Sequence, residues 1–302
     1  MLEESENIVN ITERARKSEK IIQDLCLAGF QDEAWSLLTK GQGLVRNYQL
    51  TGYFSTAKLT PSQFSEKYDA LRRNYESLAA LSSWLKQFDT DKVATLLDPQ
   101  TGDRDIARSR LSDPDLFGSG LSLYFHIEME STDIAKQKEA LDLASSFFTS
   151  GLMAHDNAQY IIDSPRFHDA FQKWDSINFL SEVTAPEYLE DARPGTISQM
   201  VRSDPNKAIE RIGSSNNPHY FQLAVGDWGH ADSTQAVRWY TNNKSNLDGP
   251  MQSAAAYAFF LNALRADELD GAEQWAREIR DSSRQKEALD LISAKSGTPA
   301  GD

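Results

Sequence analysis

Apolar residues recur at steps of three and four along most of the chain, the spacing that places side chains on one face of an α-helix. The clearest stripe follows Thr60-Pro61-Ser62, a helix start in which proline occupies the first turn and loses no needed hydrogen bond. Shorter stripes end near Gly29 and Gly151. The pattern predicts a mostly helical chain with one long helix carrying Phe64, Tyr68, Leu71, Tyr75, Leu78, Leu81, Leu85 and Phe88.

Residues 116–129 are ambiguous because apolar and polar residues alternate from 121 to 129. Such alternation suits a strand with one buried face. No partner strand is found nearby, and an isolated strand cannot satisfy its backbone N–H and C=O groups. We therefore expect a helix here and an all-α fold for the whole chain.

Glycine and proline are sparse, at 16 and 10 in 302 residues, so the places where they gather mark breaks between helices. Residues 98–115 are typical of a loop with a short helix, and a second break lies at 184–195. We expect residues 1–183 to form a helical bundle or degenerate helical repeats. Residues 184–293 would form a more regular array, and residues 294–302 a disordered tail.

A short pattern recurs in the last hundred residues: an acidic residue, an alanine four positions later, and a large side chain three positions after the alanine. The acidic residue would cap a helix N-terminus by accepting hydrogen bonds from free backbone N–H groups. The small alanine would let two helices approach closely. The three occurrences are Asp204 with Ala208 and Arg211, Asp232 with Ala236 and Trp239, and Glu268 with Ala272 and Trp275.

The spacing of these alanines, 28 and then 36 residues, leaves room for a companion helix in each interval. Residues 218–229 and 250–265 are the expected companions, and the second is rich in alanine. Paired antiparallel helices at this spacing are typical of an α-solenoid, here expected as a right-handed superhelical array.

One of these units resembles the tetratricopeptide-like helical repeats. That family has a large residue, a leucine, a small residue, then an alanine and an aromatic residue, and the corresponding positions here are Tyr220, Leu223, Ala224, Ala236 and Tyr240. The next unit departs from the pattern, because Asp248 stands near the place of the expected terminal proline. The resemblance covers about residues 200–295, and divergent bacterial helical-repeat proteins are similar to the same degree. The resemblance implies a protein-binding scaffold rather than a catalytic activity.

The chain carries 45 acidic and 31 basic residues, a formal net charge of −14. An acidic surface repels phosphate backbones, so we expect no nucleic-acid partner. No run of 18 apolar residues is present, so we expect no membrane insertion. The N-terminus lacks the apolar core of a signal peptide, which favours a cytoplasmic protein, although an exported fragment without its signal would look the same. The single cysteine, Cys26, lies in an apolar stretch typical of a core position.

Phe221, Val225 and Trp228 share one face of an expected helix in the best repeat unit. Such a stripe can belong to the core, or it can line an aromatic groove that binds a partner. We take these three as candidate partner-binding residues, and we expect no catalytic, cofactor or metal site. The predicted function is a non-catalytic scaffold for a peptide or protein segment, with the acidic surface favouring a basic partner.

Two other functions remain open. In a metal-dependent phosphohydrolase of the HD type, His126, His155-Asp156 and a later aspartate such as Asp175 would hold a divalent ion that activates water. Against this, a second His-Asp pair, His168-Asp169, shows how readily the dipeptide arises in an Asp-rich chain. The other alternative is a structural subunit that self-associates through the ends of the helical array.

Overall fold

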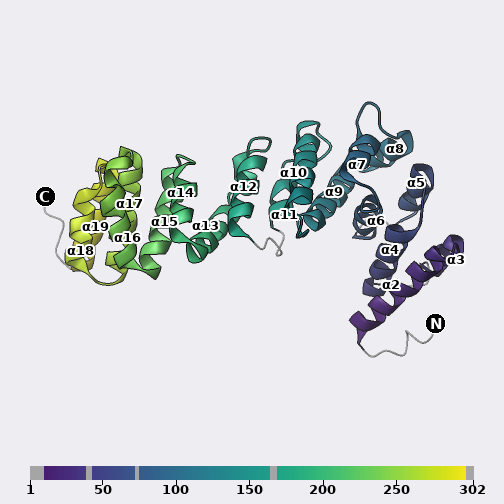
Figure 1. Ribbon diagram of the computed structural model, residues 1–302, viewed down its shortest axis with the longest axis horizontal. Coiled ribbons are helices and arrows are strands. Elements are labelled where there is room, and N and C mark those ends of the chain that lie inside the picture. Colours follow the sequence, from purple (N-terminus) through teal and green to yellow (C-terminus); the bar gives the residue numbers. More distant parts are fainter. Residues whose placement is uncertain (1–9, 39–42, 72–74, 164–168, 297–302) are drawn as a thin grey trace. The chain divides into compact units, whose positions relative to one another are not determined.

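The computed structural model describes residues 10–38, 43–71, 75–163 and 169–296 (Figure 1). Within these ranges every regular element is helical: there are 18 α-helices and two short 3₁₀ helices, and no strand. The all-α fold predicted from the helical spacing is therefore confirmed. None of the described helices is both long and apolar enough to cross a bilayer.

The chain divides into two compact units. The first unit takes in the described residues before 169 together with Ser176–Leu189. The second unit takes in Asp169–Asp175 and the described residues from Glu190 onward. Helix α12 (Ala170–Leu180) contributes residues to both units.

In the first unit, successive pairs of packed helices follow one another along the chain, with other helices between their members. Helix α2 packs on α4, α4 on α6, α6 on α9, and α9 on α11. Glycines permit the close approaches: a Cβ on Gly52 would lie 2.8 Å from the carbonyl oxygen of Glu19, and one on Gly120 would lie 2.8 Å from Leu81. The helices are α2 (Ile11–Leu27), α3 (Gln31–Leu38), α4 (Gly43–Thr56), α5 (Pro61–Asp69), α6 (Tyr75–Leu85), α7 (Thr90–Leu97), α8 (Arg104–Ser112), α9 (Pro114–Glu128), α10 (Ile134–Thr149), α11 (Asn157–Ile162) and the 3₁₀ helix η1 (Pro186–Leu189).

The long helix expected between Phe64 and Phe88 is in fact two helices, α5 and α6. Helix α5 starts as predicted, because Thr60 and Gln63 form a capping box before and inside its first turn. It ends at Asp69, and Tyr75 in the middle of the predicted stripe is 78% exposed. The stripe therefore combines the buried faces of two helices. The break between α5 and α6 leaves apolar residues spaced by three and four positions along the sequence. The ambiguous segment 116–129 lies in α9 apart from its last residue, so the expectation of a helix there is confirmed.

Aromatic rings fill the core of the first unit. The ring of Phe64 stacks on that of Trp84 with centroids 4.1 Å apart, and Phe54 meets Phe64 edge-on at 5.6 Å. Cys26 on α2 is 5% exposed, and burial raises the pKa of its thiol to about 11. The expectation that Cys26 is a core residue is confirmed.

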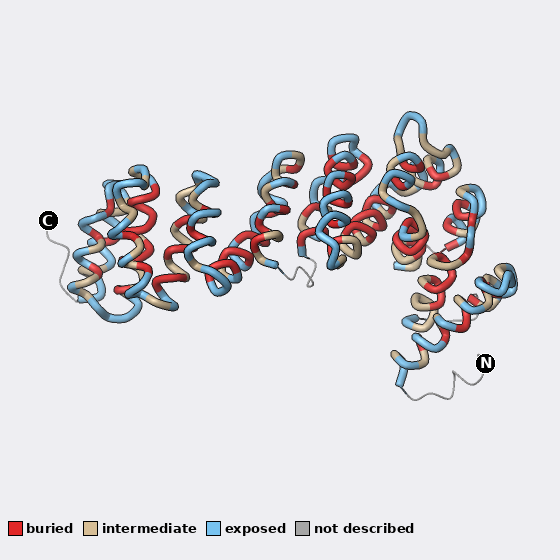
Figure 2. The backbone as a smooth tube through the Cα atoms, viewed as in Figure 1, coloured by how far each residue is buried: buried red, intermediate tan, exposed pale blue. Residues whose placement is uncertain are grey.

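The second unit follows a similar order of packing. Helix α13 packs on α15, α15 on α17 and α17 on α19, while α14, α16 and α18 each pack on neighbouring members of that set. Buried residues follow α15 and α17 along much of their length (Figure 2). The helices are α13 (Ala192–Ser203), α14 (Pro205–Gly213), α15 (Pro218–Ala231), α16 (Ser233–Asn243), the 3₁₀ helix η2 (Lys244–Asn246), α17 (Gly249–Arg265), α18 (Leu269–Glu278) and α19 (Ser282–Ser296).

The recurring alanines occupy the predicted positions. Ala208, Ala236 and Ala272 are 0%, 1% and 0% exposed, so each methyl group is buried against other helices. Asp204 and Asp232 cap α14 and α16 as predicted, with Oδ1 accepting from the backbone N–H of the third helical residue at 3.1 and 3.0 Å.

The expected cap at Glu268 is wrong, because its side chain makes no capping hydrogen bond on α18. Glutamate is not among the preferred capping residues, which have shorter side chains. The predicted tail also starts too early. Helix α19 extends to Ser296, and residues 297–302 lie outside the described residues.

Candidate functional site

A groove opens between α16 and α18 in the second unit, and we call it the α16–α18 groove. Its volume is about 660 Å³. Helices α16 and α18 supply its walls, and the C-terminal halves of α15 and α17 supply its floor. It is lined by Gly229, His230, Ser233, Thr234, Val237, Arg238, Phe259, Asn262, Ala263, Ala266, Glu268 and Trp275.

The floor of the groove depends on a close approach of α15 to α17. A Cβ on Gly229 would lie 2.8 Å from Asn262 Nδ2 and 3.4 Å from the ring of Phe259, so only glycine fits without a shift. Asn262 in turn donates an Nδ2–H hydrogen bond to the backbone carbonyl of Gly226 at 2.9 Å. A side-chain bond between the two helices thus fixes the shape of the floor.

Trp275 on α18 adds a partly exposed aromatic ring to the groove. Its ring is half-buried, with its centroid 4.6 Å from that of Phe259 and 5.8 Å from that of Tyr240. Burial raises the pKa of Tyr240, which keeps this neighbouring hydroxyl protonated. Because the rings behind it hold Trp275 in place, its exposed part can serve as a rigid anchor for a bound chain.

The three residues proposed from the sequence lie beneath this surface. Phe221, Val225 and Trp228 are 1%, 1% and 3% exposed, and all belong to the main core of the second unit. Trp239, which is half-buried, covers part of that stripe, with its ring centroid 6.2 Å from Phe221 and 6.0 Å from Trp228. The partly exposed Trp275 lines the groove, and contact of a partner with the three stripe residues stays a prediction.

Polar side chains surround the mouth of the groove. His230, Arg238 and Glu268 are all exposed, and the carboxylate of Glu268 is not used to cap α18. Ser233 and Thr234, at the start of α16, add hydroxyl groups. A bound segment would thus meet an apolar floor and a polar rim with charges of both signs, which is the common anatomy of a protein interface.

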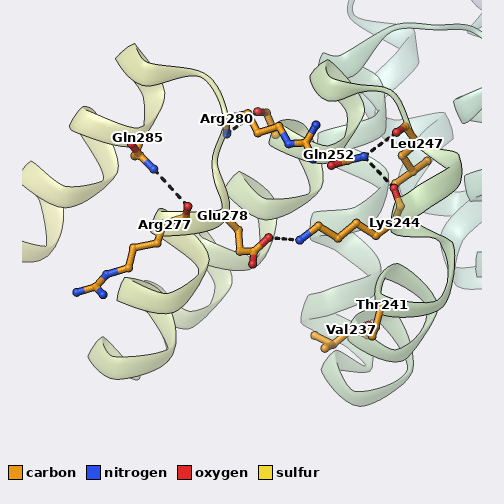
Figure 3. A network of polar contacts seen from close by, with 10 residues as sticks. Val237, Thr241, Lys244, Leu247, Gln252, Arg277, Glu278, Arg280 and Gln285 are labelled. Atoms are coloured by element: carbon orange, nitrogen blue, oxygen red, sulfur yellow. Dashed lines mark hydrogen bonds and ion pairs between the residues drawn. The ribbon is translucent and has the colours of Figure 1, made fainter.

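A polar network connects α16, α17 and α18 near the start of α17 (Figure 3). Gln252 on α17 donates from Nε2 to the carbonyls of Lys244 and Leu247, at 2.9 and 2.7 Å, where the chain leaves α16. The ammonium group of Lys244 pairs with the carboxylate of Glu278 on α18. These contacts hold the two helices that form the groove walls to the helix that forms its floor.

The contact made by Gln252 recurs at two other helix junctions. Gln285 donates to the carbonyls of Ala276 and Arg277 at the end of α18, and Gln137 donates to those of Met129 and Ser131 after α9. Each glutamine is the fourth residue of its helix and follows a capping aspartate by four positions. We call this contact the glutamine clasp; its sequence signal, Asp-x₃-Gln, was missed by sequence analysis. The clasp itself occurs at Asp133–Gln137, Asp248–Gln252 and Asp281–Gln285.

The residues of the alternative metal site have other roles in the structure. The Nδ1 atom of His126 lies 3.0 Å from the carbonyl oxygen of Tyr160, and the Asp175 carboxylate forms an ion pair with Arg211. Asp156 precedes α11 at its N-cap position, and His168 lies outside the described residues. Among the residues that the structure describes, no group of three or more His, Cys, Asp or Glu side chains is placed to hold a metal ion.

Comparison with known proteins gives no further guide to the site. No family model, no curated protein and no solved structure matches the chain.

Proposed function

We propose that this chain is a non-catalytic scaffold that binds a peptide or protein segment in the α16–α18 groove. In this proposal, helices α13 to α19 form an α-solenoid of the tetratricopeptide-like kind, and the groove lies on its surface. The observation that carries the proposal is the half-buried Trp275 in a groove of about 660 Å³ with an apolar floor and a polar rim.

Recurring contacts support the repeat architecture. Helices α16 and α17 match α18 and α19 in three respects: the buried Ala236 and Ala272, the half-buried tryptophans three residues later, and the glutamine clasps of Gln252 and Gln285. The corresponding residues lie 36 and 33 positions apart. Two helices per unit of this length are typical of helical-repeat scaffolds.

Electrostatics favours a basic partner. With a net charge of −14, the protein attracts positively charged segments over distances of about a Debye length and speeds their encounter. Arg238 at the rim would then discriminate among basic sequences by repelling those with a positive charge at the wrong position.

The test is a selection of peptides from a random library displayed on phage, using the whole chain as bait. The synthetic peptides recovered should lose about tenfold or more in affinity when Ala266→Arg places a long side chain in the groove. The matched control is Ala294→Arg on α19, which makes the same substitution at another exposed alanine and should leave binding unchanged.

Failure to recover any peptide, or equal binding by both arginine variants, would contradict the proposal. A salt titration of the same peptides tests the electrostatic part separately. Their affinity should fall as ionic strength rises, and a constant affinity would remove the argument for a basic partner.

A further inference from the structure

A second cavity lies at the opposite ends of α15 and α17 from the groove. Its volume is about 430 Å³, and it is bordered by the first residues of both helices and by the turn between α18 and α19. It shares no lining residue with the α16–α18 groove. We call it the arginine pocket; its lining is Pro218, Gly249, Pro250, Ser253, Arg280, Asp281 and Arg284.

Arg284 is held in position by uncharged neighbours. Its Nη1 donates to Oε1 of Gln222 at 3.1 Å, and its guanidinium carbon lies 5.4 Å from the centroid of the Tyr257 ring. Neither contact neutralises its charge, and the guanidinium has further N–H groups to donate. In the described part of the chain, Arg284 forms no ion pair with a carboxylate.

Ser253 has a buried hydroxyl group that can still donate a hydrogen bond. Its Oγ accepts from the backbone N–H groups of Arg280 and Asp281 at 2.9 and 3.2 Å (Figure 3 shows Arg280 at this turn). The residue is 6% exposed, and a hydroxyl that accepts two hydrogen bonds still carries its own proton. Among the described residues no acceptor is placed for that proton, although the side chain borders the pocket.

The pocket therefore presents donors from three elements. Ser253 lies on α17, Arg280 in the α18–α19 turn and Arg284 in the first turn of α19. The only acidic residue in the lining, Asp281, accepts from the backbone N–H of Arg284 at 2.9 Å as a helix cap. The start of the 17-residue helix α17 adds the partial positive charge of its dipole.

We propose that the arginine pocket binds a phosphate group. A tetrahedral oxyanion has oxygens in several directions and can meet donors arriving from three elements, whereas the two oxygens of a carboxylate lie in one plane. Arginine also recognises phosphate through paired N–H donors. The arginine pocket shares no lining residue with the groove, so phosphate binding can be tested separately from the scaffold function.

The test is a titration of the whole chain with inorganic phosphate, followed by calorimetry and by ³¹P line broadening. Arg280→Gln and Arg284→Gln should each weaken phosphate binding by about tenfold, because each removes a charge-assisted hydrogen bond. The matched control is Arg277→Gln, which removes an equal charge from an exposed arginine of α18 outside the pocket and should bind like the wild type.

Circular dichroism and thermal unfolding of each variant establish that it is folded before its affinity is interpreted. Absence of phosphate binding to the folded wild type, an equal loss in Arg277→Gln, or acetate binding as tight as phosphate would each overturn the proposal. Tighter binding of a phosphoserine peptide than of phosphate, with its unphosphorylated form inert, would identify a phosphorylated protein segment as the source. Equal binding of phosphate and the phosphopeptide would identify a small phosphate-bearing ligand.

Discussion

The two glycines of α15 that face α17 differ in what surrounds them. A Cβ on Gly229 would collide with Asn262 Nδ2 at 2.8 Å, whereas a Cβ on Gly226 would meet only the Cβ of Ala258 at an ordinary 3.8 Å. Gly229 is therefore required by the approach of the two helices. Gly226 has no such role for its missing side chain, although its carbonyl accepts the hydrogen bond from Asn262.

Gly229→Ala should lower the free energy of unfolding by about 1 to 3 kcal/mol, because Asn262 and Phe259 must shift to admit the methyl group. The comparison is Gly226→Ala, which should be neutral or stabilise by up to about 1 kcal/mol through its higher helix propensity. Urea unfolding of the two variants checks the difference. An equal effect of both changes would show that α15 and α17 do not approach as described.

At the scale of the element, the glutamine clasp determines how one helix follows another. The last carbonyls of a helix have no partner within that helix. Gln252 donates to the carbonyls of Lys244 and Leu247, of which that of Lys244 also accepts from the backbone N–H of Leu247, and so ties the start of α17 to the end of the preceding helix. Both partners are local in sequence, so the junction can form early in folding.

Gln252→Met keeps the length of the side chain and removes its donors. It should cost about 1 to 3 kcal/mol of unfolding free energy, because in a partly buried junction the carbonyl of Leu247 loses its side-chain donor and that of Lys244 keeps only the backbone N–H of Leu247. Gln274→Met, at an exposed position of α18, is the control and should change stability by less than about 0.5 kcal/mol. Chemical denaturation measures both. A neutral Gln252→Met would mean that the clasp adds nothing to stability.

The helices of the second unit are predictable from the sequence because their signals are local. Asp204 and Asp232 cap helices whose first turns follow them directly in the sequence. The buried Ala236 lies four positions after Asp232, so the whole pattern spans about two helical turns. The break between α5 and α6 was not predicted, because the helical spacing of apolar residues continues across the break. The groove was not predicted either. Trp228 and Trp275 both follow the same helical spacing, and helices distant in the sequence determine which of the two is buried.

For the whole molecule, the outer face of α19 matters for association. When α17 and α19 are aligned on their clasp glutamines, the buried Phe260 and Ala263 of α17 correspond to Ser293 and Ser296 of α19. On α17 these positions pack in the core shared with α18 and α19; on α19 they carry hydroxyl groups. Another helix would gain little by packing on them, which weakens the case for self-association through this face.

Ser293→Phe combined with Ser296→Ala would restore the apolar pattern of α17 beside Leu289, which is already exposed. We expect this variant to self-associate, with a mass by light scattering that rises with concentration more than that of the wild type. Ala294→Phe adds one aromatic residue at an exposed position of the same helix and serves as the control. Unchanged mass in the double variant would show that the serines do not limit association.

The buried Cys26 makes the unmodified protein a reporter of its own opening motions. It is the single thiol in the chain, and it lies on α2, which packs on α4. An alkylating reagent can react only when α2 swings away and the thiol ionises. The rate of alkylation under native conditions, followed by mass spectrometry with no engineered label, therefore measures how often the first unit opens at α2.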